Sequence, residues 1–245
     1  MNTDSAGALE GSIQRCGNAV LQALDPERRR ELCRYGRETK LPAGKILYLM
    51  NEEIRTMCFV NAGLVSFVGS VGNDCSVGVA LGGSETVVGS IAVLDRDSMP
   101  FGAVVLSDSQ AVQVPVERVL LCFRNDPDMH GAMLRQLSLL LTQVTLSAVC
   151  NARHTVEQRL SRWLLMGSDC SGGNDLRVTQ HEWAIMLGVA RSTVNLSVAK
   201  LKSQGAILHR RGILQVADRA VLLTFACDCY RSFRDEYARI SKRSR

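Results

Sequence analysis

The sequence lacks the features of a membrane or secreted protein. No apolar run approaches the length of a membrane span, and the first residues have neither the basic start nor the apolar core of a signal peptide. The nine cysteines are odd in number and scattered through apolar patterns, which favours reduced thiols over a disulfide framework. We therefore expect a cytoplasmic protein with no membrane partner, and its 245 residues suffice for two domains.

Motifs of catalysis and metal binding are missing as well. The four histidines all lie outside the β-rich region of the chain, and no metal-ligand spacing or nucleophile elbow occurs. Cys227 and Cys229 lie two residues apart in a helical pattern, where side chains face different ways, so we expect packing there rather than metal binding. These absences argue against an enzyme, and we expect no cofactor.

Charge is unevenly distributed along the chain. Residues 153–245 carry 16 Lys and Arg against 8 Asp and Glu, a net charge of +8, whereas residues 1–152 carry 13 against 16, a net charge of −3. A basic last part is typical of a domain that meets a polyanion, although a solvated basic surface has the same composition.

The segment 179–201 in this basic part is predicted to form two short helices joined by a tight turn. Thr179 and Glu182 form a capping box at the start of the first helix, and Gly188 supplies the backbone freedom for the turn. One buried stripe of the second helix is formed by Val194, Val198 and Leu201. The remaining face suits the DNA major groove, as in a helix-turn-helix; the alternative is an ordinary αα-hairpin with a solvated face.

Three other regions precede this segment. Residues 1–36 are expected to form an N-terminal helical segment. Residues 37–125 contain short runs of Val, Leu, Ile and Phe between glycine-bearing turns such as PAG, NAG, GND and LGG, which is typical of an antiparallel β-barrel or jelly roll. A long helix is predicted over 126–152, with Asp126 as its N-cap and Pro127 in its first turn.

That long helix is too apolar to be packed on one side only. We expect its second face to meet another copy of the chain as a homodimer seam, and the alternative is a helix buried within one subunit. The expected seam residues are Met133, Leu137, Leu140, Leu141 and Val144.

Residues 153–245 are expected to form a DNA-binding domain with a C-terminal helix. A helix over 154–166 and a loop over 168–175 lead into the helix-turn-helix. Residues 206–218 predict two short strands around a basic turn, and the chain from Arg219 onward is predicted to be helical.

The order of these parts resembles the CRP/FNR family of bacterial transcription regulators. The resemblance covers nearly the whole chain and is strongest over 155–218, in the motifs VEQRLSRWLL, LGVARSTV and HRRGILQVAD. It implies an α+β fold with a cyclic-nucleotide-binding-like barrel, a dimerisation helix and a winged helix-turn-helix. It also implies a homodimer that reads a two-fold symmetric operator on double-stranded DNA, with RNA polymerase as a partner if the protein activates.

The barrel departs from the family members that bind cyclic nucleotides. Those members carry a Gly-Glu-Leu cassette followed by an Arg; here Ser90 replaces the Glu, and Pro100 or Phe101 stands in place of the Arg that neutralises the phosphate. We therefore expect an effector other than a common cyclic nucleotide, or none, with a cyclic-nucleotide-responsive regulator as the alternative. The matching effector-pocket residues are Gly89, Ser90, Ile91, Phe101, Gly102 and Ala103.

The resemblance also assigns roles on the DNA-binding face. Base readout is expected from Arg191, Ser192, Asn195 and Leu196, a set that predicts a half-site different from the family's TGTGA type. Backbone contacts are expected from Thr179, Gln180, Thr193, Lys200, Lys202, Arg210 and Arg211. The remaining alternative is a ligand-binding interaction module without specific DNA binding.

Overall fold

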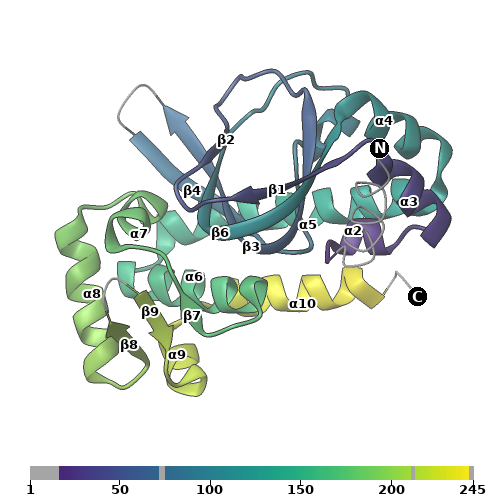
Figure 1. The fold of residues 1–245 in the computed structure, drawn as a ribbon. Helices are drawn as coiled ribbons and strands as arrows, with labels where there is room; N and C mark the ends of the chain where they lie inside the picture. The colour runs from purple at the N-terminus through teal and green to yellow at the C-terminus, as the bar shows by residue number, and fades with distance from the viewer. Residues whose placement is uncertain (1–16, 72–74, 211–212, 243–245) are drawn as a thin grey trace, which may run out of the picture.

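The computed structural model describes residues 17–71, 75–210 and 213–242. A rolled antiparallel sheet forms one part, a long helix runs beneath it, and a smaller helical domain lies at one end (Figure 1). Residues 1–16 of the expected segment 1–36, the GND turn and the wing residue Arg211 lie outside the described residues.

Two short helices precede the sheet, α2 (Ala19–Gln22) and α3 (Pro26–Arg34). Asp25 caps α3, with Pro26 in its first turn. Asn18 caps α2 through its side-chain oxygen, and its amide donates to the carbonyl oxygens of Val60 and Thr86 at 2.9 Å each. This buried side chain therefore anchors the helical segment to the sheet.

The sheet has six strands, all paired antiparallel, so the expected architecture is confirmed. The strands are β1 (Arg37–Leu41), β2 (Ile46–Tyr48), β3 (Thr56–Val71), β4 (Cys75–Gly82), β5 (Val87–Val88) and β6 (Gly102–Pro115). The hydrogen-bonded order is β1-β6-β3-β4, with β2 paired to β6 and β5 paired to β3. Phe59, Val65 and Val105 belong to the apolar core inside the roll.

Three local expectations in this region were wrong. The NAG stretch is a bulged part of β3 rather than a turn, because Gly63, at φ 99°, absorbs a register shift against β6. Residues 90–94 belong to one of the apolar runs that we expected to be strands, but they form the 3₁₀ helix η1 (Ser90–Leu94). The helix α4 (Val116–Asn125) was not expected at all.

The long helix α5 spans Pro127–Arg153, with Asp126 as its N-cap, as predicted. By length and composition it is the one helix in the described residues that could cross a membrane, but 44% of its most apolar 18-residue stretch is buried inside the structure, and a core helix passes the same test. Three of the expected seam residues are buried within the subunit, in the core formed with the sheet: Met133, Leu137 and Leu140. Leu141 is 68% exposed and Val144 half-buried, so only these two of the expected seam residues reach the solvent-facing side of α5.

The last part of the chain holds the helix-turn-helix and two further helices. Its elements are α6 (Val156–Ser171), β7 (Asp175–Leu176), α7 (Gln180–Leu187), α8 (Arg191–Ser203), β8 (Ile207–Arg210), β9 (Ile213–Val216), α9 (Arg219–Phe225) and α10 (Asp228–Lys242). The helix α6 runs through residues 168–171, where a loop was expected, and ends at Gly172 in a left-handed conformation. The last helix, α10, returns beneath the barrel and packs on α5 and α6 (Figure 1).

Candidate DNA-binding face and effector pocket

The helix-turn-helix forms as its sequence predicts. The backbone N–H of Glu182 donates to the Thr179 hydroxyl at 3.2 Å, and the Glu182 carboxylate accepts from the Thr179 N–H at 2.5 Å, which completes the capping box. Gly188 ends α7 at φ 61° and makes the turn into α8. Ala190 caps α8 without a side-chain hydrogen bond, so this helix start lacks a stabilisation of about 1 kcal/mol.

One face of α8 is left open to solvent. Val194, Val198 and Leu201 are buried in the domain core. The four predicted base-reading residues, Arg191, Ser192, Asn195 and Leu196, are all exposed on the remaining face. Leu196 is 74% exposed, although no packing within the chain requires a leucine there. The helix therefore presents one cation, two polar groups and one apolar side chain outward together.

The predicted phosphate-contacting residues surround this face, but they are not equally free. Lys202 and Arg210 are exposed, whereas Gln180 and Thr193 are half-buried. The Lys200 ammonium lies 3.5 Å from the Glu157 carboxylate of α6, so its charge is partly engaged.

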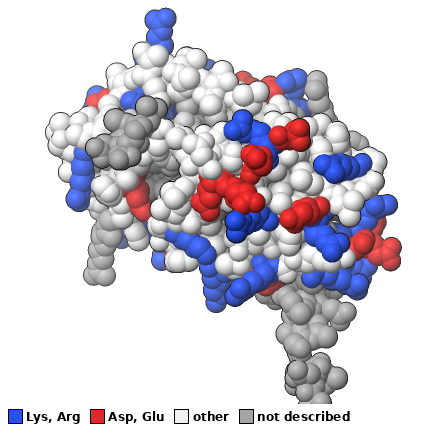
Figure 2. Space-filling model, turned by 90° about the horizontal axis from the view of Figure 1, so that it is seen from above, with Lys and Arg blue, Asp and Glu red and all other residues white. Residues whose placement is uncertain are grey.

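The surface on the barrel side of the molecule carries acidic and basic side chains interspersed with one another (Figure 2).

The helix α7 also docks on strand β4 of the barrel. The Ser66 hydroxyl donates to the Met186 sulfur at 2.7 Å, and Gly78 faces the same methionine. A Cβ atom at Gly78 would lie 2.5 Å from that sulfur and 3.1 Å from the Met186 Cα, so only glycine permits this approach. The barrel and the helix-turn-helix are thus in direct contact.

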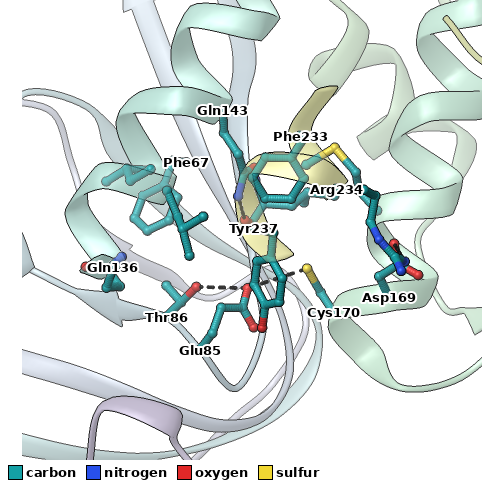
Figure 3. Close-up of a pocket in the computed structure, with 14 residues that line it drawn as sticks. Phe67, Glu85, Thr86, Gln136, Gln143, Asp169, Cys170, Phe233, Arg234 and Tyr237 are labelled. Carbon is teal, nitrogen blue, oxygen red and sulfur yellow. Dashed lines mark hydrogen bonds and ion pairs between the residues drawn. The ribbon is translucent and has the colours of Figure 1, made fainter. Parts of the chain in front are cut away.

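A pocket of about 250 Å³ lies between the barrel, α5, α6 and α10. Phe67 and Leu81 enter it from the sheet, Gln136 and Gln143 from α5, and Tyr237 from α10 (Figure 3). The Gln136 side-chain oxygen is buried and has no hydrogen-bond partner among the described residues. The pocket therefore offers an apolar wall with one unused acceptor.

Two of the three charged groups that line this pocket, Asp169 and Arg234, are paired with each other. The Asp169 carboxylate accepts from Arg234 at 3.0 Å, from Arg219 at 2.6 Å and from the Tyr230 hydroxyl at 2.8 Å. Burial, reinforced by the nearby Glu85 carboxylate, holds the pKa of the Cys170 thiol well above its ordinary value, so that thiol is neutral. Among the described residues, Arg234 is the only cation that lines the pocket, and its charge is paired with Asp169.

Comparison with known proteins identifies both halves of the chain. Residues 38–126 match the cyclic nucleotide-binding domain, and residues 158–225 match the Crp-like helix-turn-helix domain. The chain belongs to the CRP/FNR family. This family consists of transcription regulators that bind DNA, rather than enzymes.

Individual relatives of this CRP/FNR protein are distant. The cyclic AMP receptor protein of Thermus thermophilus is 22% identical over 210 residues, which cover 84% of this chain and 95% of the relative. The c-di-GMP responsive global regulator CLP of Xanthomonas campestris has a TM-score of 0.65 at 20% identity, covering 79% of this chain and 100% of that one. FixK2 of Bradyrhizobium japonicum has a TM-score of 0.68 at 15% identity, covering 78% and 98%.

In this CRP/FNR protein, residues at the position of the family's nucleotide-binding cassette pack into the barrel itself. Ser90 is buried at the start of η1, and Ala103 is fully buried in β6. The Phe101 ring packs edge-on against Phe67, with their centroids 5.3 Å apart. None of the six expected effector-site residues lines the pocket described above, and the expected effector site in the barrel stays a prediction.

Proposed function

We propose that this regulator binds a palindromic operator as a homodimer through the exposed face of α8. The observation that carries the proposal is that one face of the second helix is buried, while four side chains are exposed together on the other: Arg191, Ser192, Asn195 and Leu196. Arg191 would take the O6 and N7 of a guanine, Asn195 an adenine, and Leu196 a thymine methyl. An activator of this kind would also contact RNA polymerase.

The solvent-facing side of α5 supports the dimer. Between residues 131 and 150, the exposed side chains of α5 are all uncharged, and several of them recur at heptad spacing. They are Leu134, Ser138, Leu141, Thr145, Ala148 and Val149. Two copies of this stripe packed about a two-fold axis would set the two α8 helices on one duplex. The barrel at 37–125 and the dimerisation helix at 126–152 remain our proposed domain division.

We infer that the effector, if one is used, is a small neutral or cationic molecule rather than a cyclic nucleotide. Arg234 is held by Asp169. The barrel has Ser90 where family members that bind cyclic nucleotides have the Glu, and Pro100 or Phe101 where they have the Arg. A cyclic phosphate would therefore lack a charge-assisted partner at either place. The Gln136 acceptor would pair with a donor on the ligand.

Selection of binding sites from random duplex DNA by the purified protein tests this function. We expect a palindromic consensus without added ligand. The Arg191→Ala variant should lose about 1–3 kcal/mol of specific binding and relax one base position, whereas Lys202→Ala should weaken all sequences alike. Sequence-blind binding by the wild-type protein, unchanged by a screen of small molecules, would instead support an interaction module without specific readout.

A further inference from the structure

Four metal-ligating side chains meet where α5 ends and α10 begins. They are Cys150 and His154 from the end of α5, and Cys227 and Cys229 from the start of α10. One ligand atom from each lies within 4.8 Å of all the others. All four residues are buried or half-buried, and the two pairs are about 75 residues apart along the chain.

The spacing of these atoms suits a single tetrahedral ion. With Zn–S bonds of about 2.3 Å, tetrahedral geometry sets neighbouring sulfurs about 3.8 Å apart. The Cys150 and Cys227 sulfurs are 3.5 Å apart, and the Cys229 sulfur is 3.7 Å from His154 Nδ1. A disulfide would need a sulfur separation of about 2.05 Å, and an iron–sulfur cluster distributes its cysteines over separate irons.

The backbone conformation explains how Cys227 and Cys229, which would face different ways in a continuous helix, both reach the cluster. The C-cap of α9 is Ala226, whose ψ of 146° is extended. Cys227 therefore lies before the first turn of α10 rather than within a helix. The Cys227 carbonyl accepts from the Tyr230 N–H at 3.0 Å, as an N-cap does. His154 likewise leaves the helical conformation as the C-cap of α5. Our expectation of simple packing assumed one continuous helix and was wrong on that point.

Buried charge beside the cluster calls for an anionic partner. Arg159 and Arg162 of α6 are 8% and 1% exposed, and each has an Nε without a hydrogen-bond partner. In the described part of the chain, neither forms an ion pair with a carboxylate; both lie in electrostatic contact with Cys150 instead. Buried charges are normally paired. Three thiolates on one divalent ion carry a net charge of −1, which would offset one of the two guanidinium charges.

We propose that Cys150, His154, Cys227 and Cys229 bind one Zn²⁺ ion that fastens the start of α10 to the end of α5. Three thiolates and an imidazole are ligands that zinc favours, and four protein ligands leave no open position, so the site is structural. Binding joins three sulfurs and one nitrogen to the metal and releases the thiol protons to solvent.

The location gives the ion a mechanical role. His154 and Thr155 connect the long helix α5 to α6, the first helix of the DNA-binding part. An ion at this junction would hold the angle between the two and keep α10 beneath the barrel. Any effect on operator affinity rests on the function proposed above, whereas binding of the ion does not.

Metal titration of the full-length protein tests the site directly. The reduced, metal-free chain is titrated with Zn²⁺ against a chromophoric chelator, and with Co²⁺, whose thiolate charge-transfer and d–d absorption report tetrahedral coordination. We expect one equivalent of metal per chain and a higher unfolding temperature when it is bound. Absence of a thiolate–Co²⁺ band in the wild-type protein overturns the proposal. The proposal is also overturned if Cys150 and Cys227 form a disulfide and the reduced chain takes up no zinc.

Single-ligand variants locate the ion. Cys227→Ser and His154→Ala should each raise the Zn²⁺ Kd at least about 10-fold, the loss that even outer-shell changes produce. Cys122→Ser removes a thiol on α4, outside the cluster, and should leave the affinity unchanged. An equal loss in Cys122→Ser contradicts the assignment. If the protein binds one equivalent of zinc but no DNA, the zinc site is supported and only the proposed function is overturned.

Discussion

The side-chain amide of Gln143 pairs with the backbone of Leu81 in the manner of a neighbouring strand. Its oxygen accepts from the Leu81 N–H and its nitrogen donates to the Leu81 carbonyl, both at 2.9 Å. Gln143 is in the middle of α5 and Leu81 near the end of β4, so these two bonds fix the long helix to the barrel. The Ser147 hydroxyl, one turn later, donates to the Val79 carbonyl at 2.9 Å.

Replacing Gln143 with leucine should therefore destabilise the protein markedly. The change leaves a buried N–H and a buried carbonyl of Leu81 without partners, at about 1–3 kcal/mol each, so we expect a loss of about 2–6 kcal/mol. Equilibrium unfolding in denaturant measures this loss. Thr142→Ala is the control, because the Thr142 hydroxyl bonds only within the helix, to Ser138. Equal stability of the two variants would show that the Gln143 bonds are not important.

The contact between Gly78 and Met186 gives a second prediction. In Gly78→Ala the new methyl group meets the Met186 side chain and Cα, so α7 must move away from β4. We expect a loss of about 1–3 kcal/mol, the usual cost of overpacking. A Met186→Ala change in the same chain should restore part of it, since the methionine sulfur is the nearest obstacle. Gly102→Ala, whose Cβ would meet nothing closer than 3.5 Å, should be nearly neutral.

The α5 stripe predicts how the dimer can be broken. Leu141 is 68% exposed, and each dimer would bury it twice. Leu141→Lys should remove about 1.5–3 kcal/mol of apolar burial per subunit, which raises the dimer Kd by at least about 100-fold. Sedimentation velocity over a range of concentrations measures it. Leu121→Lys alters a residue of α4 that is 53% exposed and should leave the dimer intact. Loss of the dimer in both variants, or in neither, would place the seam elsewhere.

What the sequence could predict was governed by local rules. The capping box at Thr179 and Glu182, and the turn at Gly188, depend on residues a few positions apart, and both form as expected. The Asp126 cap and the two strands beside the wing follow from equally short patterns.

The failures came from contacts between distant segments. Apolar periodicity alone puts Leu137 and Leu140 at the dimer seam, but the hydrogen bonds of Gln143 to β4 hold α5 with both leucines packed on the sheet. Gly63 resembles a turn residue, but the facing strand β6 converts it into a bulge. The helix break at Ala226 carries no Gly or Pro, so nothing local indicated that Cys227 and Cys229 would face Cys150.

The ion pair between Lys200 and Glu157 leads to the last prediction. While Glu157 holds the Lys200 ammonium at 3.5 Å, that charge is only partly available to a phosphate. Glu157→Gln should release it and remove a repulsive carboxylate, which strengthens binding to all DNA sequences by about two- to fivefold, the worth of an exposed ion pair. Fluorescence anisotropy over a range of salt concentrations should also show a slope of log K against log salt that is steeper by about 0.9. Asp175→Asn removes the same charge from β7, so an equal gain there would mean that net charge, rather than the release of Lys200, is responsible.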